Sequence, residues 1–341
     1  MVFFFIKLAV GLFVLSFFFL MQAQAETVKP TFVRSSAAVL IIPVGLTLSP
    51  DGTKIHYARY NLDTRLYQYD LSIPFNVSSI DSSSEVILNV NSGGDDNLSS
   101  TDLHDLTFNG DGTKVYTIDW RGNMNVHSLS TPYDLSNATQ DDDDGIEWED
   151  DYAGEGGSDS DHRLHAMRFN NDGTKMFLVD ADGTVGVIEY NLSTPYLPGS
   201  ASFGNFFGLG DLGSHFQDID FDDDGTRMYV LEGRYGAANA NRIHVYKLST
   251  GFDTSTATFV SSMLNFFDAA GGGGSPGSMH FSKDGMKFYQ ATFANNGYGN
   301  QKKVFEYDLS CPYGIVLCEI ETVSVASAQV EIAKNVIHQN T

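Results

Sequence analysis

Apolar and polar residues alternate in short runs along most of this chain, and five of these runs end at an Asp-Gly pair. The apolar residues before each pair lie two positions apart, which is the period of a β-strand with one buried face. They are Leu46/Leu48, Leu106/Phe108, Met167/Phe169, Ile219/Phe221 and Met279/Phe281. Asp-Gly favours a tight turn, because glycine accepts a positive φ and aspartate hydrogen-bonds nearby backbone. Each pair therefore predicts two antiparallel strands joined by a turn.

The Asp-Gly pairs belong to a longer unit that occurs five times. Their aspartates are Asp51, Asp111, Asp172, Asp224 and Asp284, and a second element follows each of them as YDLSIPF, HSLSTPY, YNLSTPY, YKLSTGF or YDLSCPY. This second element predicts a third strand and its turn, and the runs 85–90 and 258–264 indicate a fourth strand. Four strands cannot bury both of their faces alone, so the units must stack. A solenoid of stacked hairpins is the alternative, but units of this length favour an all-β, five-bladed propeller over residues 26–320.

Two segments are candidates for the strand that closes the ring. Residues 31–33 read Thr-Phe-Val, as do residues 258–260 in the predicted outer strand of the fourth unit. The N-terminal segment then supplies the outer strand of the last blade. In the alternative, residues 315–320 take that place and the N-terminal segment packs beside them.

The repeated core resembles a family of bacterial propeller repeats of the F-S-P-D-G-T-K-M-Y type. The resemblance covers roughly residues 40 to 315, with Leu48 in place of the phenylalanine in the first copy and Met286 in place of the threonine in the fifth. Such repeats occur in secreted and cell-surface proteins. The resemblance implies the fold and says little about function, because propellers carry many unrelated activities.

The two ends of the chain differ from the repeats. Residues 1–25 combine Lys7, an apolar run and Ala23-Gln24-Ala25, which predicts a cleaved signal peptide rather than a membrane anchor. Residues 321–341 form a C-terminal linker or short amphipathic helix, since Ala328, Ile332 and Val336 recur every four positions. This stretch resembles the segment that links the passenger domain to the membrane-embedded barrel in bacterial autotransporters. We expect an exported protein that is periplasmic, secreted or on the cell surface, either freely soluble or followed by an outer-membrane barrel.

Composition excludes several classes of partner. The formal net charge is −23, so a nucleic acid, which needs a basic footprint, is excluded, as is docking of the propeller itself on anionic membranes. The sequence has no H-E-x-x-H motif and no phosphate-binding loop. Its two cysteines, Cys311 and Cys318, flank a Pro-Tyr-Gly turn and either form a disulfide or remain thiols.

Polar side chains gather in the loops that enter the innermost strands, on the face of the ring opposite the Asp-Gly turns. In a ring these side chains point at one channel mouth: Asp102, His104, Asp105, Arg163, His165, His215, Gln217 and Asp218. One interpretation is a ligand or metal site, because convergent polar groups in a concavity are typical of binding sites. The other is structural, with these groups hydrogen-bonded to turn backbone or to one another where each blade begins.

Two acidic stretches are candidates for calcium, which prefers oxygen ligands. The first is the run 141–161, which includes Asp142 and Asp144. The second is Asp220, Asp222 and Asp224 in a D-x-D-x-D-G pattern, although the repeat itself accounts for Asp222 and Asp224 as turn residues. A solvated acidic surface is the alternative for both.

The sequence thus favours an exported, non-catalytic binding or adhesion propeller for an extracellular protein or glycan. The alternative is a lactonase-like hydrolase with a metal at the channel mouth, held by groups such as Asp105, His165 and Asp218. The number of hard ligands that converge on the channel distinguishes the two.

Overall fold

The structure is a computed structural model that describes residues 26–37, 43–59, 64–90, 103–119, 122–141, 163–181, 185–210, 215–233, 242–264, 275–293 and 303–318. The predicted signal peptide, Asp102, Asp142, Asp144 and the C-terminal helix lie outside these residues. Within them, no helix has the length and apolar character needed to cross a membrane. The chain divides into two units, of which Lys29–Val316 contains the repeats. In the other unit, β1 (Glu26–Thr27) pairs antiparallel with β22 (Leu317–Cys318).

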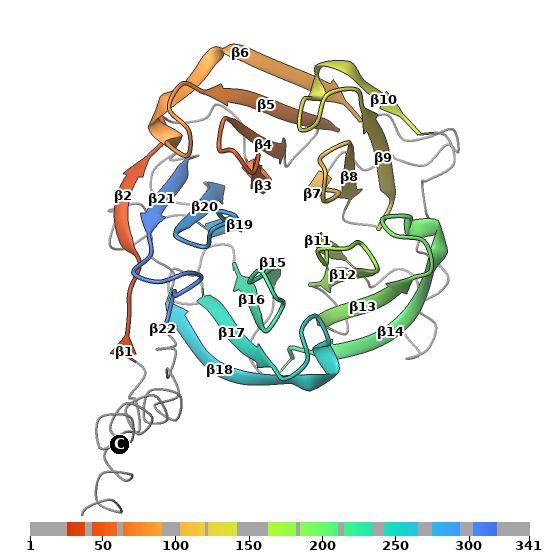
Figure 1. The fold of residues 1–341 in the computed structure, drawn as a ribbon, viewed down its shortest axis with the longest axis vertical. Coiled ribbons are helices and arrows are strands. Elements are labelled where there is room, and N and C mark those ends of the chain that lie inside the picture. The colour runs from red at the N-terminus through yellow and green to blue at the C-terminus, as the bar shows by residue number, and fades with distance from the viewer. Residues whose placement is uncertain are drawn as a thin grey trace, which may run out of the picture. The chain divides into compact units, whose positions relative to one another are not determined.

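Five four-stranded antiparallel sheets form a ring within Lys29–Val316, a five-bladed β-propeller (Figure 1). Blade 1 contains β3 (Pro43–Leu48), β4 (Lys54–Arg59), β5 (Arg65–Leu71) and β6 (Ile80–Asn89), and blade 2 contains β7 (Leu103–Phe108), β8 (Lys114–Asp119), β9 (Met124–Leu129) and β10 (Ala138–Gln140). Blade 3 contains β11 (Leu164–Phe169), β12 (Lys175–Asp180), β13 (Gly186–Leu192) and β14 (Ala201–Gly208), and blade 4 contains β15 (Phe216–Phe221), β16 (Arg227–Glu232), β17 (Arg242–Leu248) and β18 (Ala257–Leu264). Blade 5 contains β19 (Ser275–Phe281), β20 (Lys287–Phe293), β21 (Val304–Asp308) and β2 (Thr31–Ser35). The predicted fold is therefore confirmed.

The N-terminal strand closes the ring. β2 pairs antiparallel with β21, with Thr31 opposite Asp308 and Ser35 opposite Phe305. The outer place of blade 5 is thereby filled, as the first of the two alternatives predicts. Figure 1 shows β2, near the red end of the chain, beside β21, near the blue end. The Glu306 carboxylate of β21 also forms an ion pair with Arg34 of β2 at 3.4 Å.

The two repeated sequence elements pack on each other within each blade. The glycine of each of the five repeated Asp-Gly pairs has a positive φ, between 66° and 73°, and so does the aromatic residue that ends the second element, between 56° and 62°. In blade 2 the Tyr133 N–H donates to the Gly112 carbonyl at 2.8 Å, and the Tyr133 ring lies directly over the glycine. A Cβ at Gly112 would be 2.2 Å from that ring. Both turns of a blade therefore lie on one face of the ring.

The same aromatic residue joins neighbouring blades through its carbonyl. The hydroxyl of Tyr116 in blade 2 donates to the carbonyl of Tyr196 in blade 3 at 2.7 Å. Equivalent bonds cross the other four interfaces, formed by Tyr229 to Tyr313 at 2.7 Å, Tyr289 to Phe75 at 2.9 Å, His56 Nε2 with the Tyr133 carbonyl at 2.9 Å and Lys175 Nζ to Phe252 at 2.8 Å. We call these five bonds the aromatic ties.

Three interfaces carry a second bond further from the axis, which we call the outer tie. A buried polar side chain on the third strand accepts the first N–H of the short 3₁₀ helix in the next blade. The donors belong to η2 (Leu135–Asn137), η4 (Thr254–Thr256) and η1 (Val77–Ser79). The bonds are Leu135 N–H to Gln68 Oε1 at 2.7 Å, Thr254 N–H to Glu189 Oε2 at 2.9 Å and Val77 N–H to Glu306 Oε2 at 3.2 Å.

Candidate functional site

The innermost strands place two rows of side chains around the channel. The first is the sixth residue before each Asp-Gly aspartate, where every strand has a bulge or irregularity in its register. We call it the inner row, and it consists of Gly45, Asp105, Ala166, Asp218 and Ser278. The second lies two residues further on, nearer the Asp-Gly turns. We call it the pocket row, and it consists of Thr47, Thr107, Arg168, Asp220 and His280.

The two inner-row aspartates bind the backbone of the next blade. Asp105 accepts the N–H of Leu106 at 2.8 Å through one oxygen and the N–H of Met167 at 2.8 Å through the other. Asp218 repeats this arrangement with Ile219 at 2.7 Å and Met279 at 2.8 Å. Both carboxylate oxygens of each aspartate are thus bonded to backbone N–H groups.

Ser278 continues the same pattern across the interface between blades 5 and 1. Its hydroxyl donates to Asp218 Oδ2 at 2.6 Å, and its oxygen accepts the Leu46 N–H at 2.7 Å. The inner row therefore joins blade 2 to 3, blade 4 to 5 and blade 5 to 1. We call these three contacts the inner ties.

Arg168 of the pocket row connects the two aspartates across three blades. Its Nη1 donates to Asp105 at 2.6 Å and its Nη2 donates to Asp218 at 2.8 Å. Burial raises the pKa of Asp105 to about 7, and the guanidinium opposes this shift. Burial also raises the pKa of Asp218, again against the guanidinium. Two buried carboxylates thus share one cation, and their oxygens are occupied by donors of the ring itself.

Three of the remaining predicted residues gather at the channel mouth opposite the Asp-Gly turns. The rings of His104 and His165 have their centroids 4.4 Å apart, and His165 Nδ1 lies 2.9 Å from the Phe216 carbonyl. Burial, the nearby His165 and the charge of Arg163 hold the pKa of His104 well below its usual value. The same mouth includes Gln217, whose Nε2 donates to the carbonyl of His215 at 3.3 Å.

The D-x-D-x-D-G stretch separates into two kinds of residue. Asp224 accepts the N–H of Thr226 at 3.0 Å and its hydroxyl at 2.6 Å, while Asp222 accepts the N–H of Arg227 at 2.8 Å. These bonds form the turn, as the repeat predicts. Asp220 belongs to the pocket row instead. Among the described residues, no group of three or more His, Cys, Asp or Glu side chains is placed to hold a metal ion.

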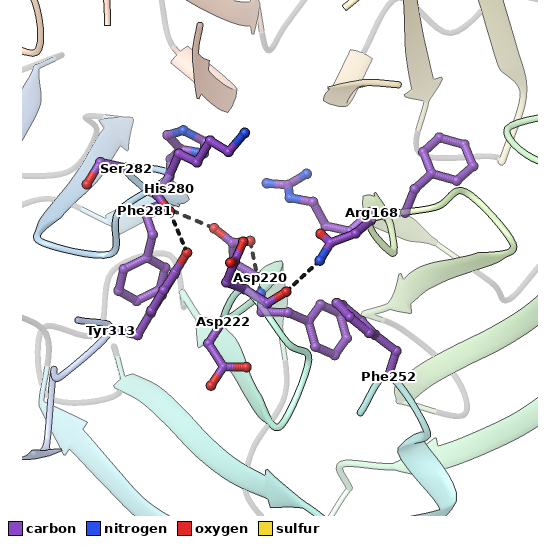
Figure 2. A pocket seen from close by; sticks show the side chains of 13 residues that line it. Arg168, Asp220, Asp222, Phe252, His280, Phe281, Ser282 and Tyr313 are labelled. Atoms are coloured by element: carbon purple, nitrogen blue, oxygen red, sulfur yellow. Dashed lines mark hydrogen bonds between the residues drawn. The ribbon is translucent and has the colours of Figure 1, made fainter. Parts of the chain in front are cut away.

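A cavity of about 130 Å³ lies at the turn end of the channel. Its lining comes from blades 3, 4 and 5: Arg168, Phe169, Asn171, Asp220, Phe221, Asp222, Asp223, Phe252, His280, Phe281, Ser282, Lys283 and Tyr313. Figure 2 shows the Arg168 and His280 side chains on either side of Asp220, with Phe252, Phe281 and Tyr313 around them. We call this cavity the turn-face pocket. It combines hydrogen-bond donors, acceptors and aromatic rings in one small concavity.

Burial shifts the titration of the charged groups in the turn-face pocket. Asp220 accepts the N–H of Phe221 at 2.9 Å and that of Phe281 at 3.3 Å. Burial raises the pKa of Asp220 to about 6, against the effect of Arg168, and raises that of Asp222 to about 6. Burial and the nearby guanidinium lower the pKa of His280 to about 3. At neutral pH the pocket therefore offers a neutral imidazole, carboxylate acceptors and guanidinium donors.

The sequence analysis missed Arg168 and His280 as functional candidates and considered Asp220 only for calcium. A signal was present in the alignment of the repeats. At the pocket-row position blades 1 and 2 have threonine, whereas blades 3, 4 and 5 have arginine, aspartate and histidine in succession. Cys311 and Cys318 are disulfide-bonded.

The comparisons with known proteins show a likeness to solved structures. No protein-family model matches the sequence, and no curated protein is similar to it. A solved structure from Bacteroides uniformis, named "putative 6-phosphogluconolactonase", aligns with a TM-score of 0.44 and 16% identity. The alignment covers 84% of this chain and 73% of that one.

Proposed function

We propose that this protein is an exported binding propeller whose channel is non-catalytic and whose ligand enters the turn-face pocket. The observation that supports this most is the convergence of Arg168, Asp220 and His280 from three consecutive blades on one cavity. The lining includes one serine, Ser282, whose Oγ donates to Asp284 at 2.6 Å as part of the turn. The pocket thus has groups for recognition, without an activated nucleophile.

The chemistry of the lining favours a saccharide. Carboxylates accept hydrogen bonds from hydroxyl groups, and arginine and lysine donate to them. The Phe252 and Tyr313 rings offer apolar surface beside these groups. The volume is below the roughly 300–1,000 Å³ of sites for drug-sized ligands, so we expect one sugar unit at the end of a glycan to enter by its edge.

A thermal-shift titration with a panel of monosaccharides, followed by calorimetry, tests this function. We expect at least one sugar to raise Tm, because a ligand selective for the native state stabilises it. Asp220→Asn and His280→Ala should remove this shift. Gln217→Ala, at the opposite mouth, is the control and should keep it. No response to any sugar, or an unchanged response in Asp220→Asn, would contradict the proposal.

The metal-dependent hydrolase is the alternative, and its named ligands have other contacts. Asp105 and Asp218 bind backbone N–H groups and Arg168, and His165 contacts the Phe216 carbonyl. We therefore expect no hydrolysis of sugar lactones above the buffer rate with added Ca²⁺, Mg²⁺ or Zn²⁺. A metal-dependent rate that disappears in His165→Ala would reverse this conclusion.

A further inference from the structure

Three side chains of blade 4, none of them in the inner row or the pocket row, form a hydrogen-bonded row across adjacent strands. Ser262 of β18 lies directly opposite His244 of β17, and its Oγ is 2.7 Å from His244 Nδ1. On the other side of the ring, His244 Nε2 is 3.1 Å from Glu232 Oε2 of β16. Serine, histidine and glutamate are thus connected in the order needed to activate a hydroxyl.

The proton positions in this row follow from the chemistry of its members. An ionised glutamate only accepts hydrogen bonds, so a neutral His244 keeps its proton on Nε2 toward Glu232. Nδ1 then presents a lone pair, and the Ser262 hydroxyl donates to it. In this tautomer the imidazole can take a proton from serine.

The three groups differ in exposure as a nucleophilic site requires, with the hydroxyl more exposed than the base and the carboxylate. His244 and Glu232 are 1% and 5% exposed, whereas Ser262 is only half-buried. Ser262 also belongs to β18, the outermost strand of its blade. Part of Ser262 is therefore open to solvent, whereas the base and the carboxylate are buried.

The fold does not need polar side chains at the His244 and Ser262 positions. In blade 3 the residues equivalent to His244 and Ser262 are Ile188 and Phe206, which lie opposite each other in the sheet. In blade 5 the residue equivalent to His244 is Phe305. An apolar side chain therefore fits, while a buried histidine and glutamate must lose hydration. Carboxylates recur at the Glu232 position, as Asp119 in blade 2 and Asp180 in blade 3, where they accept backbone N–H groups. In blade 4 the carboxylate contacts His244.

We propose that Ser262 is a nucleophile that accepts the acyl group of small activated esters at the outer edge of blade 4. Ser262 Oγ bonds to the carbonyl carbon while its proton moves to His244 Nδ1. The bond to the leaving alcohol breaks, and the alcohol takes that proton. Water then repeats the step, with His244 as base, and releases the acid. Glu232 is a positioning residue that holds the imidazole. This activity is separate from the proposed ligand binding in the channel.

Covalent labelling of the whole chain with a fluorophosphonate tests the proposal, because Oγ bonds to phosphorus as fluoride leaves. Intact-protein mass should increase by one adduct, and peptide mapping should place it on Ser262. Ser262→Ala should abolish labelling. Ser261→Ala is the matched control, since its side chain points to the other face of the strand, and it should be labelled normally. An adduct absent from Ser262 overturns the proposal.

Two further variants separate chemistry from structure. His244→Phe copies blade 5, so it should fold with an equal or higher Tm and be labelled about 100-fold more slowly, the usual effect of losing a general base. Equal labelling of His244→Phe would show that Ser262 is not activated. Glu232→Gln should change the pH profile of labelling, and Glu232→Asp should restore it in part. A profile that is the same in Glu232→Gln would remove Glu232 from this role.

Discussion

At the residue scale, the glycine of each Asp-Gly pair meets two requirements at once. Its positive φ suits glycine, and the aromatic ring of the second repeated element occupies the space where a side chain would begin. Gly112→Ala should therefore lower the free energy of unfolding by about 2–4 kcal/mol, from left-handed strain and overpacking against Tyr133. Denaturant unfolding measures this. Gly210→Ala is the control, because a Cβ there meets nothing within 4 Å, and its stability should stay within about 0.5 kcal/mol of the parent.

At the element scale, each interface between neighbouring blades has an inner tie, an outer tie or both. Inner ties join blades 2 and 3, and blades 4 and 5, where the outer position is Val126 or Val245. At the first of these, the 3₁₀ helix of blade 3 begins with Pro198, which has no N–H to donate. Outer ties join blades 1 and 2, and blades 3 and 4. The closing interface between blades 5 and 1 has both kinds.

The aromatic ties allow a conservative test of how much one interface bond contributes. Tyr229→Phe removes the hydroxyl that bonds the Tyr313 carbonyl at 2.7 Å, and blade 3 has phenylalanine, Phe177, at the same position. We expect a loss of about 1 kcal/mol in unfolding free energy with no change of fold. Tyr133→Phe removes an exposed bond of 3.4 Å and should be nearly neutral. Equal effects of the two substitutions would contradict the role of the tie.

Local signals explain why the fold was predictable from sequence. The strand period, the Asp-Gly turns and the fivefold repeat each depend on neighbouring residues, and the likeness of residues 31–33 to residues 258–260 indicated the closing strand. The channel was less accessible, because Asp105 and Asp218 share Arg168 only after three blades come together. The repeat predicted where Asp105 and Asp218 lie in the ring. Whether they bind backbone or a ligand depends on distances in the folded protein, and the spacing of residues in the sequence does not contain these.

At the scale of the whole molecule, two sets of buried groups titrate in opposite senses between about pH 4 and 7. Asp105 and Asp220 have raised pKa values, so the folded state binds more protons and stability falls as pH rises through this range. His56, with a pKa lowered to about 4 by burial, and His280, at about 3, act the other way, because the unfolded state binds more protons. We therefore expect a broad, nearly flat stability profile.

Removing one of these titrating groups should change how the unfolding free energy depends on pH. Asp220→Asn deletes a group that favours low pH, so its unfolding free energy should rise from pH 4 to 7 by roughly 1–2 kcal/mol more than that of the parent. His280→Gln should tilt the profile in the opposite direction. Urea unfolding at half-unit pH steps measures both, and parallel profiles for all three proteins would show that these groups do not titrate as described.

The closing strand has a consequence for the order in which the fold is made. β2 leaves the ribosome before any blade, yet its partner β21 is the last strand of the ring to be synthesised. A growing chain therefore has an unpaired edge at blade 5 and an open interface at blade 1 until synthesis has passed residue 308. Contacts this distant in sequence form slowly, because most of the chain must be organised before they can form. The nascent protein thus reaches its closed state only after synthesis of the ring, wherever it is then carried.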